Sequence, residues 1–472
     1  MRPTTTRAVS TTRQRTPLAA VALGVCAVVL AGCANGIAGT AAADPEAVPP
    51  AGKPIGYTPA NFDIKYAQPD GADQIARDAL ADVISEYSSW YPQVFGHEFT
   101  PPTGGYFSIA PGEGHQSGCM TGPDDESIVD NAFYCHNKDE VAYWRPLLDE
   151  FASEYSDMQV GLVLAHELGH TIQYREGMSD MLSIVLETQA DCFAGSWARS
   201  VADGRDPHFK FNPENLDKTL LAWARELPGQ LGADPTAEGE HGSTFDRVTA
   251  IIEGYQQGPE ACRDHFNNQR RFTQAEFDRT SGNASDDGQG NATYERSLDI
   301  GKATYDAFYA AKFAELGGNW KSPALIFGGS GDPSCVSTEV VSYCQANNSV
   351  VISNQDALRG VHDKYGDFAM VTAMGLAYGT AAIVELGYSA QDPKAMLAAT
   401  CLTGAAAGEL IDPANPYQVI LSPGDFDEAT VMLLSADATN PVVDTGGSTA
   451  FDRMENFRYG VNGNVTSCGV SG

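Results

Sequence analysis

The spacing of the cysteines constrains the fold of this 472-residue chain more than any other sequence feature. Eight of them follow residue 33 and form two sets of four: Cys119, Cys135, Cys192 and Cys262, then Cys335, Cys344, Cys401 and Cys468. Within the two sets, the first two cysteines are 16 and 9 positions apart, and the last two are 70 and 67 positions apart. A spacing that recurs in order predicts two tandem copies of one module, each with the same two disulfides. We therefore predict the disulfides Cys119–Cys135, Cys192–Cys262, Cys335–Cys344 and Cys401–Cys468.

Short stretches of sequence repeat along with the cysteines. Residues 245–247 and 451–453 both read Phe-Asp-Arg, with a glycine nine positions and a cysteine seventeen positions after each phenylalanine. Ahead of them, residues 133–143 and 342–352 each contain two short β-forming runs around a polar turn, which predicts a hairpin in both copies. Residues 281–290 have no periodic apolar pattern, which is typical of a linker. We predict a first domain over 56–280, a linker over 281–295 and a second domain over 296–472.

The first 33 residues have the layout of a secretory signal. Four arginines precede an apolar run over residues 18–30, which is too short to span a bilayer comfortably. The run ends in Leu-Ala-Gly-Cys at Cys33, which resembles the lipobox of bacterial lipoproteins. We therefore expect a signal peptide over 1–32, a diacylglycerol on Cys33 and a flexible tether over 33–55. The lipid would hold the exported chain at the outer face of the cytoplasmic membrane, in the cell envelope, where disulfides persist. An ordinary signal peptide with a chance cysteine is the alternative.

The net charge decides between kinds of partner. The chain has 29 lysines and arginines against 61 aspartates and glutamates, which gives a formal charge of -32. Such an acidic surface repels phosphate backbones, so we exclude nucleic acid as a partner. It also repels an anionic membrane, so attachment must come from the N-terminal lipid. The sequence makes no prediction about the oligomeric state.

The first copy contains a pattern typical of a metal site. Residues 157–174 have the apolar spacing of a helix, and the sequence HELGH, from His166 to His170, lies within it. Histidines four residues apart lie one turn apart on one helix face, so both can bind a single ion. Glu167 lies beside them, where its carboxylate can take a proton from water. The competing interpretation is a pair of histidines on a solvated helix.

A second predicted helix begins after Ser179, a suitable N-cap, and continues through Trp197. Glu187 and Asp191 are four residues apart on it and share a face. After a short turn this helix would run antiparallel to the first, so Glu187 could complete a zinc site of two histidines and one glutamate, with a fourth position for water. Asp191, one turn further on, could accept the ring N–H of a ligand histidine and fix its tautomer. Two exposed acids on an acidic protein are the alternative.

These segments, HELGHTIQ followed by ETQADCFAGSW, resemble the putative neutral zinc metallopeptidase family of bacteria. The resemblance covers roughly residues 119–262 and departs from the family at Thr171, where that family often has another, non-ligand histidine. It implies an α+β fold: a predominantly helical, zincin-like domain with a small β-hairpin or sheet. It also implies one Zn²⁺ per chain, bound in the first domain only. The implied ligands are His166, His170 and Glu187, with Glu167 as the catalytic base and Asp191 in contact with a ligand.

Two further features of the first copy have open interpretations. His241 is our candidate for the donor that stabilises the oxyanion, because the second copy has Gly446 at its place; a surface histidine is the alternative. Arg247 is expected to be structural, since the second copy keeps it as Arg453. The strand predicted over Glu140–Trp144 could pair with an extended substrate, or could be a plain core strand of the hairpin.

The second copy has lost every residue of the predicted zinc site. Alignment on shared glycines and cysteines puts Leu376, Ala377 and Thr380 at the places of the first histidine, the base and the second histidine. Met396 and Thr400 take the places of the two acids. The copies therefore share the residues that a fold needs and differ at those that carry chemistry. We predict that the second domain is a degenerate copy of the same fold, which supports the first domain or binds substrate or a partner.

The function that the sequence supports best is a lipid-anchored zinc metallopeptidase. Its substrate would be a protein or peptide of the envelope or the extracellular space. The alternative is a non-catalytic envelope scaffold in which both modules bind partners. Glu167 favours the enzyme, because a structural zinc site needs no base beside open water.

Overall fold

The computed structural model describes most of the chain, and the structural statements below concern that part. The described residues are 54, 56–210, 213–226, 241–273, 291–328, 335, 338–412, 415–417, 419, 421–422, 424–435, 442–443 and 446–471. Cys33, the predicted signal peptide, nearly all of the predicted tether and residues 281–290 of the predicted linker lie outside them. We refer to the described residues up to 273 as the first half and to those from 291 onward as the second half.

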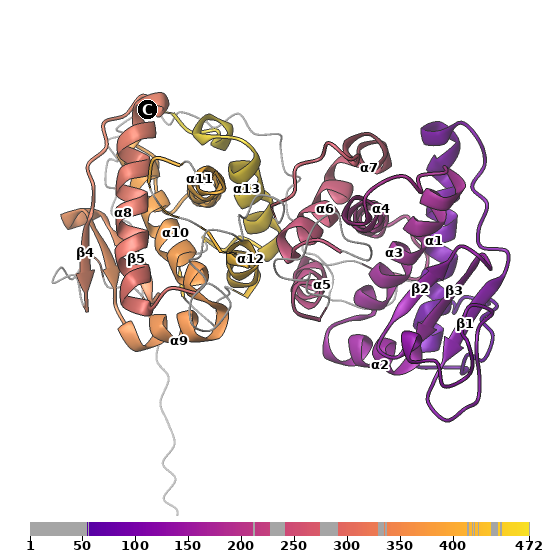
Figure 1. Cartoon of the computed structure of the whole chain (residues 1–472). Helices are drawn as coiled ribbons and strands as arrows, with labels where there is room; N and C mark the ends of the chain where they lie inside the picture. Colours follow the sequence, from indigo (N-terminus) through magenta and orange to yellow (C-terminus); the bar gives the residue numbers. More distant parts are fainter. Residues whose placement is uncertain are drawn as a thin grey trace, which may run out of the picture. The chain divides into compact units, whose positions relative to one another are not determined.

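Each half combines helices with one small sheet, which confirms the predicted α+β class (Figure 1). The first half contains α1 (Ala72–Phe95), β1 (Gly105–Ile109), η1 (Glu126–Ile128), β2 (Ala132–Cys135), β3 (Glu140–Trp144), α2 (Arg145–Glu154), α3 (Asp157–Arg175), α4 (Ser183–Ala202), α5 (Pro213–Glu226), α6 (Thr244–Gln257) and α7 (Pro259–His265). The second half contains α8 (Tyr294–Lys312), η3 (Phe313–Leu316), β4 (Ala324–Phe327), β5 (Val341–Cys344), η5 (Gln345–Asn347), β6 (Ser349–Ile352), α9 (Gln355–Tyr365), α10 (Asp367–Glu385), α11 (Pro393–Leu410), α12 (Asp425–Ser435), α13 (Ala450–Asn462) and η6 (Val465–Cys468).

The two sheets have the same topology. In the first half, β3 is the central strand, parallel to β1 and antiparallel to β2, with Tyr143 opposite Ala132. In the second half, β6 lies in the same way between β4 and β5. The strand Glu140–Trp144 is therefore hydrogen-bonded on both sides and has no free edge. Its suggested pairing with a substrate is wrong, and the interpretation as a core strand holds.

All four predicted disulfides are present, namely Cys119–Cys135, Cys192–Cys262, Cys335–Cys344 and Cys401–Cys468. One disulfide of each half joins helices or turns that are far apart in the sequence. The first links α4 to α7, and the second links α11 to η6. The repeated cysteine spacing was therefore sufficient to predict the pairing.

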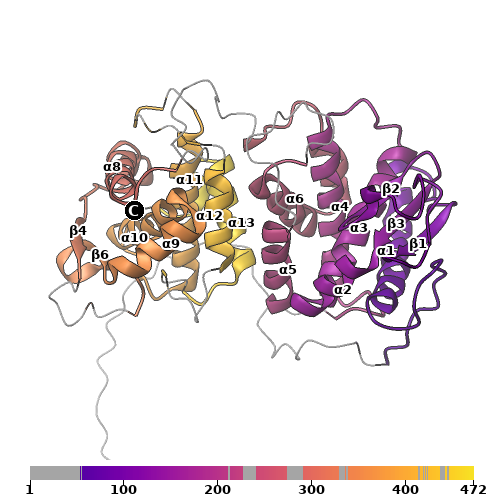
Figure 2. The ribbon, with the colours of Figure 1, turned by 60° about the horizontal axis from the view of Figure 1, so that its bottom comes forward.

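Glycines allow the same close helix contact in both halves. Figure 2 shows α4 beside α6 and α11 beside α13. A Cβ on Gly195 of α4 would overlap the carbonyl oxygen of Ile251 in α6. A Cβ on Gly404 of α11 would overlap the carbonyl oxygen of Phe457 in α13 in the same way. Because no side chain fits between these backbones, only glycine permits the contact.

The predicted helix boundaries differ from the observed ones at three places. The helix predicted over residues 157–174 is α3, which ends one residue later. The next helix begins later than predicted, because Ser179 lies in the preceding turn and Leu182 is the N-cap. The N–H of Leu182 donates to Asn268 Oδ1 at 2.9 Å, a contact across 86 positions. Helix α8 begins at Tyr294, inside the predicted linker, because the Thr293 hydroxyl caps its first turn.

Helix α10 is long and apolar enough to cross a membrane on length and composition alone, with a mean hydropathy of 1.4. However, 89% of that stretch is buried inside the protein. It contacts α8, α9, α11 and α12. Helix α10 is therefore the central core helix of the second half.

Three carboxyl groups lie together at the N-terminus of α10. They belong to Asp367, Asp425 and Glu428, and one oxygen of each lies within 4.8 Å of the others. Glu428 accepts a hydrogen bond from the N–H of Phe368 at 2.8 Å, and Asp367 accepts one from the N–H of Ala292 at 3.0 Å. Burial and mutual repulsion raise the pKa of Asp425 to about 8 and that of Glu428 to about 10. The folded protein therefore holds protons here that an unfolded chain would release.

We expect the stability of the protein to fall as the pH rises from about 5 to 9. The pKa values of Asp425 and Glu428 are higher in the folded protein than in the unfolded chain. Their contribution to the free energy of unfolding is therefore fully present below about pH 4 and is lost as the pH rises through the pKa values of the folded protein. Each proton held only by the folded state contributes about 1.4 kcal/mol per pH unit. Glu428→Gln stays neutral at every pH and should reduce the slope. Denaturant unfolding at several pH values measures the change in the free energy of unfolding with pH. Equal slopes for the wild-type protein and Glu428→Gln would contradict the prediction.

Candidate metal centre

Two consecutive helices of the first half bring the predicted metal ligands together. Helix α3 carries His166 and His170, and α4 carries Glu187 and Asp191. The helices approach closely at Gly169, where a Cβ would lie 2.9 Å from the backbone of the facing helix. The spacing of four residues on each helix then turns both histidines and both acids to one side.

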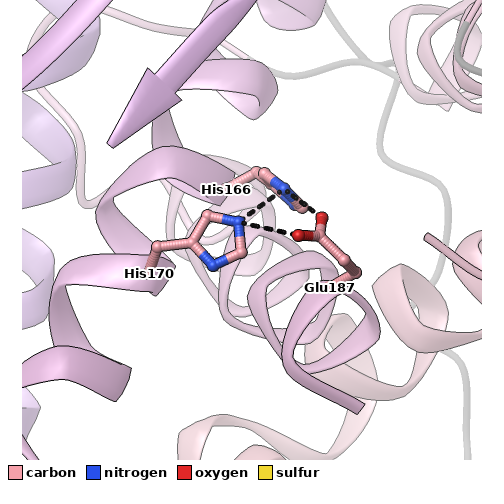
Figure 3. A group of neighbouring side chains, drawn as sticks. All are labelled: His166, His170 and Glu187. Carbon is pink, nitrogen blue, oxygen red and sulfur yellow. Dashed lines mark hydrogen bonds and ion pairs between the residues drawn. The ribbon is translucent and has the colours of Figure 1, made fainter. Parts of the chain in front are cut away.

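His166, His170 and Glu187 point toward one another (Figure 3). His166 Nε2 lies 3.2 Å from His170 Nε2 and 3.3 Å from Glu187 Oε2, and His170 Nε2 lies 3.6 Å from Glu187 Oε1. Ligand atoms about 2.1 Å from a tetrahedral zinc ion lie about 3.4 Å from one another, so these three groups fit that ion. Glu187 Oε2 is also buried without a hydrogen-bond donor among the described residues. A cation would supply the missing partner.

Asp191 orients the first histidine. Its Oδ1 lies 2.8 Å from His166 Nδ1, which leaves Nε2 for a metal. Arg247 of α6 donates from Nε to Asp191 Oδ2 at 2.9 Å and from Nη2 to Oδ1 at 3.1 Å. Burial opposes the ionisation of Asp191, but the charges of Arg247 and His166 outweigh it and lower the pKa. Arg247, predicted to be structural, therefore supports the carboxylate that contacts His166.

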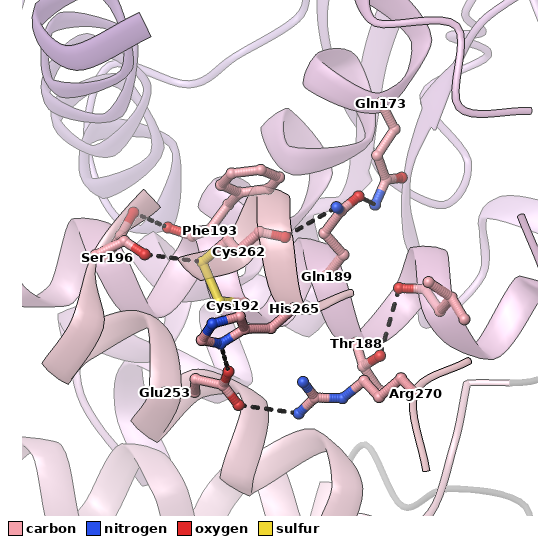
Figure 4. The surroundings of a disulfide bond; sticks show 12 residues. Gln173, Thr188, Gln189, Cys192, Phe193, Ser196, Glu253, Cys262, His265 and Arg270 are labelled. Atoms are coloured by element: carbon pink, nitrogen blue, oxygen red, sulfur yellow. Dashed lines mark hydrogen bonds and ion pairs between the residues drawn. A yellow bond between two sulfur atoms is a disulfide. The ribbon is translucent and has the colours of Figure 1, made fainter. Parts of the chain in front are cut away.

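The second histidine is oriented by a residue that the sequence did not single out. His170 Nδ1 lies 2.8 Å from Gln173 Oε1. The Gln173 amide donates to the Leu186 carbonyl at 2.6 Å and to Gln189 Oε1 at 3.2 Å, and Gln189 donates to the Cys262 carbonyl at 3.0 Å (Figure 4). These amides connect His170 to the disulfide between α4 and α7. The one available signal was the position of Gln173, three residues after His170 on the same helix face.

Glu167 lines the same cleft and is held by a strand. Its Oε2 accepts the N–H of Tyr134 in β2 at 2.8 Å. Burial raises the pKa of Glu167, although the positive charges of His166 and His170 oppose the rise. A buried carboxylate with a raised pKa is suited to accept a proton in a reaction. The Tyr134 contact has no sequence signature, because any residue offers a backbone N–H.

The electrostatic balance of the cluster favours positive charge at the histidines. Burial alone would lower the pKa of His166, but Asp191 and Glu187 outweigh it and raise the pKa to about 10. Burial would raise the pKa of Glu187, but the two histidines hold it well below its usual range. The carboxylates therefore stabilise a cation between them, whether a proton or a divalent metal.

His241 also reaches the cleft. Its Nε2 lies 3.6 Å from Glu187 Oε2, and 48% of its side chain is exposed. Burial lowers the pKa of His241, so the neutral imidazole is favoured. The structure therefore places this imidazole beside a proposed ligand and within reach of a molecule that enters the cleft.

The cleft that holds these groups has a volume of about 900 Å³. Strand β2 and helices α2 to α5 contribute to its walls. Much of the lining is apolar or aromatic, including Phe133, Phe151, Val163, Met178, Leu186 and Trp223. A cleft of this size and lining can bind an organic molecule with apolar groups beside the two histidines and Glu187.

The second half has no such set of ligands at the aligned positions. Thr380 Oγ1 lies 3.9 Å from Met396 Sδ, so the side chains aligned with His170 and Glu187 also contact each other. Leu376 and Ala377, aligned with the first histidine and the base, are buried and apolar. The helix packing is therefore retained at positions that provide neither the imidazoles nor the carboxylates of the first half.

Two comparisons found similarity to known proteins. The model of the family described as "Putative neutral zinc metallopeptidase" matches residues 19–266, which is just over half of the chain. The chain is also similar to Uncharacterized protein YpfJ of Escherichia coli strain K12, with 30% identity over 105 residues, and to the protein of that name in strain O6:H1. The similar region is 18% of this chain and 35% of each relative, so the chain spans about a third of their length. No solved structure matches the chain.

Proposed function

This chain belongs to the putative neutral zinc metallopeptidase family, and on that premise we propose that its first half hydrolyses peptide bonds of envelope or extracellular proteins. One observation carries the proposal: the metal-binding groups of two histidines and one glutamate approach one another to 3.2–3.6 Å, in a cleft that also contains a second carboxylate, that of Glu167. Three protein ligands leave a coordination position for water or substrate, whereas structural zinc sites have four. A scaffold would need neither the open position nor the base.

The proposed reaction uses Glu167 as a base and then as an acid. When bound at His166, His170 and Glu187, zinc supplies Lewis acidity, which polarises the scissile carbonyl and lowers the pKa of water. Glu167 takes a proton from the attacking water and then delivers it to the nitrogen of the leaving amine. Its hydrogen bond from Tyr134 holds the carboxylate in the cleft during both transfers.

Other residues orient the reacting groups. Asp191 and Gln173 keep the proton of each ligand histidine on Nδ1, so that Nε2 is free to bind. In our proposal His241 donates a hydrogen bond to the oxyanion that develops on the substrate carbonyl. Its half-exposed position beside Glu187 supports this role.

The proposed function is tested by metal removal. The purified full chain should contain about one zinc ion and cleave a mixed peptide library, with cleavage sites identified by mass spectrometry. A chelator such as 1,10-phenanthroline should stop cleavage, and added zinc should restore it, because the Lewis acid is then absent or present. In the same assay His241→Gln should lower kcat without changing zinc content. A protein that binds no metal, or that cleaves equally without it, would not be a zinc peptidase.

We further propose that Cys33 carries the lipid that retains the protein in the envelope. In a bacterial host, Cys33→Ser is expected to move the protein from the membrane fraction to the soluble fraction, because the acidic chain has no charge-based affinity for an anionic surface. Fractionation and detergent partitioning measure the shift. The proposal fails if the wild-type protein partitions into the aqueous phase.

A further inference from the structure

Four helices form the main contact between the two halves: α5 and α6 of the first, α12 and α13 of the second. Each helix of the first pair contacts both helices of the second pair. In the order of elements, α5 corresponds to α12 and α6 corresponds to α13. If each helix is replaced by its counterpart in the other half, the same pairs of helices are therefore in contact.

Two aspartates make reciprocal contacts across this surface. The N–H of Phe245, in the first turn of α6, donates to Asp427 Oδ1 of α12 at 3.1 Å. The N–H groups of Ala450 and Phe451, in the first turn of α13, donate to Asp217 of α5 at 2.9 Å. Phe245 and Phe451 are the equivalent residues of the repeated Phe-Asp-Arg sequence. An exchange of equivalent contacts is the property of a two-fold symmetric dimer interface.

Buried rings and an ion pair surround these contacts. The ring centroid of Phe245 lies 5.0 Å from that of Phe426 and 6.2 Å from that of Phe457. Glu253 of α6 is buried and accepts a hydrogen bond from Arg458 Nη2 of α13 at 2.9 Å. Helix α6 is thus packed against the second half rather than against water along this face.

Helix α6 connects this contact to the metal centre. Arg247 lies two residues after Phe245 and holds Asp191, which in turn holds His166 Nδ1. The equivalent Arg453 of α13 instead donates to backbone carbonyl oxygens within the second half. The two equivalent helices therefore differ. Hydrogen bonds connect Arg247 of α6 to the proposed zinc ligand His166, whereas those of Arg453 in α13 lead to no proposed ligand.

We propose that the second half is a built-in partner that positions the zinc site of the first, and that Asp427 is the positioning residue. A helix begins with N–H groups that no helical carbonyl accepts. The hydroxyl oxygen of Ser243 accepts a hydrogen bond from the N–H of Asp246. The carboxylate of Asp427 accepts one from the N–H of Phe245. Together they fix the first turn of α6, from which Arg247 extends. The inference rests on the zinc site of the proposed function and is independent of the substrate.

The chain offers a matched pair of variants to test this. Asp427→Ala removes the contact to α6, and Asp217→Ala removes the equivalent contact to α13, which leads to no ligand. Both should lower the Tm to a similar extent, but only Asp427→Ala should weaken zinc binding, by about threefold to tenfold. That is less than the roughly 10–100-fold that loss of a ligand's direct partner costs, since Asp427 acts through two further residues. Asp427→Asn keeps an oxygen that can accept the same N–H and should restore the affinity.

Zinc affinity of the full-length variants is measured by competition with a chromophoric chelator, so the readout requires no catalysis. Unchanged affinity in Asp427→Ala would overturn the inference, as would an equal loss in both alanine variants. If Asp427→Ala does not fold, Asp427→Ser takes its place with the same expectations, because its shorter side chain leaves the Phe245 N–H without this acceptor. A wild-type protein that binds zinc but cleaves no peptide would refute the proposed function alone, and the affinity comparison would still decide this inference.

Discussion

Glu167→Gln is expected to lower kcat for peptide hydrolysis by roughly 10²–10⁴-fold while the protein keeps one zinc ion per chain. Glutamine has nearly the same size and can still accept the N–H of Tyr134, which lies 2.8 Å from Glu167 Oε2. It cannot take a proton from water, so the reaction loses its general base. Peptide cleavage and elemental analysis of the same preparation measure the two effects together.

A control separates this effect from the loss of one negative charge. Glu150 is an exposed glutamate of α2, and Glu150→Gln should leave both kcat and zinc content unchanged. Wild-type activity in Glu167→Gln would exclude Glu167 as the base. Loss of zinc from that variant would instead identify Glu167 as a ligand, which would contradict the proposed ligand set.

Glu187→Gln is expected to have the opposite pattern, with loss of zinc as the primary effect. Glu187 provides the only carboxylate among the three groups that fit the ion, and its Oε2 is buried without a hydrogen-bond donor among the described residues. A neutral amide in its place removes the charge that stabilises the cation. We expect zinc affinity to fall by more than the roughly 10–100-fold typical of residues behind the ligands, and activity to fall with it.

The two glutamine variants form a pair in which each is the control for the other. Competition with a chromophoric chelator gives the affinity, and a peptide assay at saturating zinc gives the activity. Zinc should partly rescue Glu187→Gln but should not rescue Glu167→Gln. If both variants bind zinc as tightly as the wild-type protein, Glu187 is not a ligand and the proposed centre is wrong.

The sequence predicted those parts of the site that depend on spacing along a helix. His166, His170, Glu187 and Asp191 each follow from a separation of four residues and from the order of two helices. The disulfides followed from the repeated cysteine spacing, because two sets with similar spacing favour the same pairing in each. Local periodicity and repetition are properties of the sequence itself, so these features could be predicted without a structure.

The features that the sequence did not predict depend on contacts between distant segments. Tyr134 contributes a backbone N–H to Glu167, and every residue type except proline offers one. Asn268 fixes the start of α4 from 86 positions away. The reciprocal contacts of Asp217 and Asp427 join residues on opposite halves, where an acidic residue otherwise suggests only a solvated surface. Each of these requires knowledge of which helices are neighbours.

The reciprocal contact between the halves is formed within one chain, so it does not depend on protein concentration. Two separate copies would associate by a bimolecular equilibrium and would come apart on dilution. A covalent connection replaces that equilibrium by a fixed effective concentration. A single molecule, however dilute, would therefore keep α6 in contact with α12 and α13.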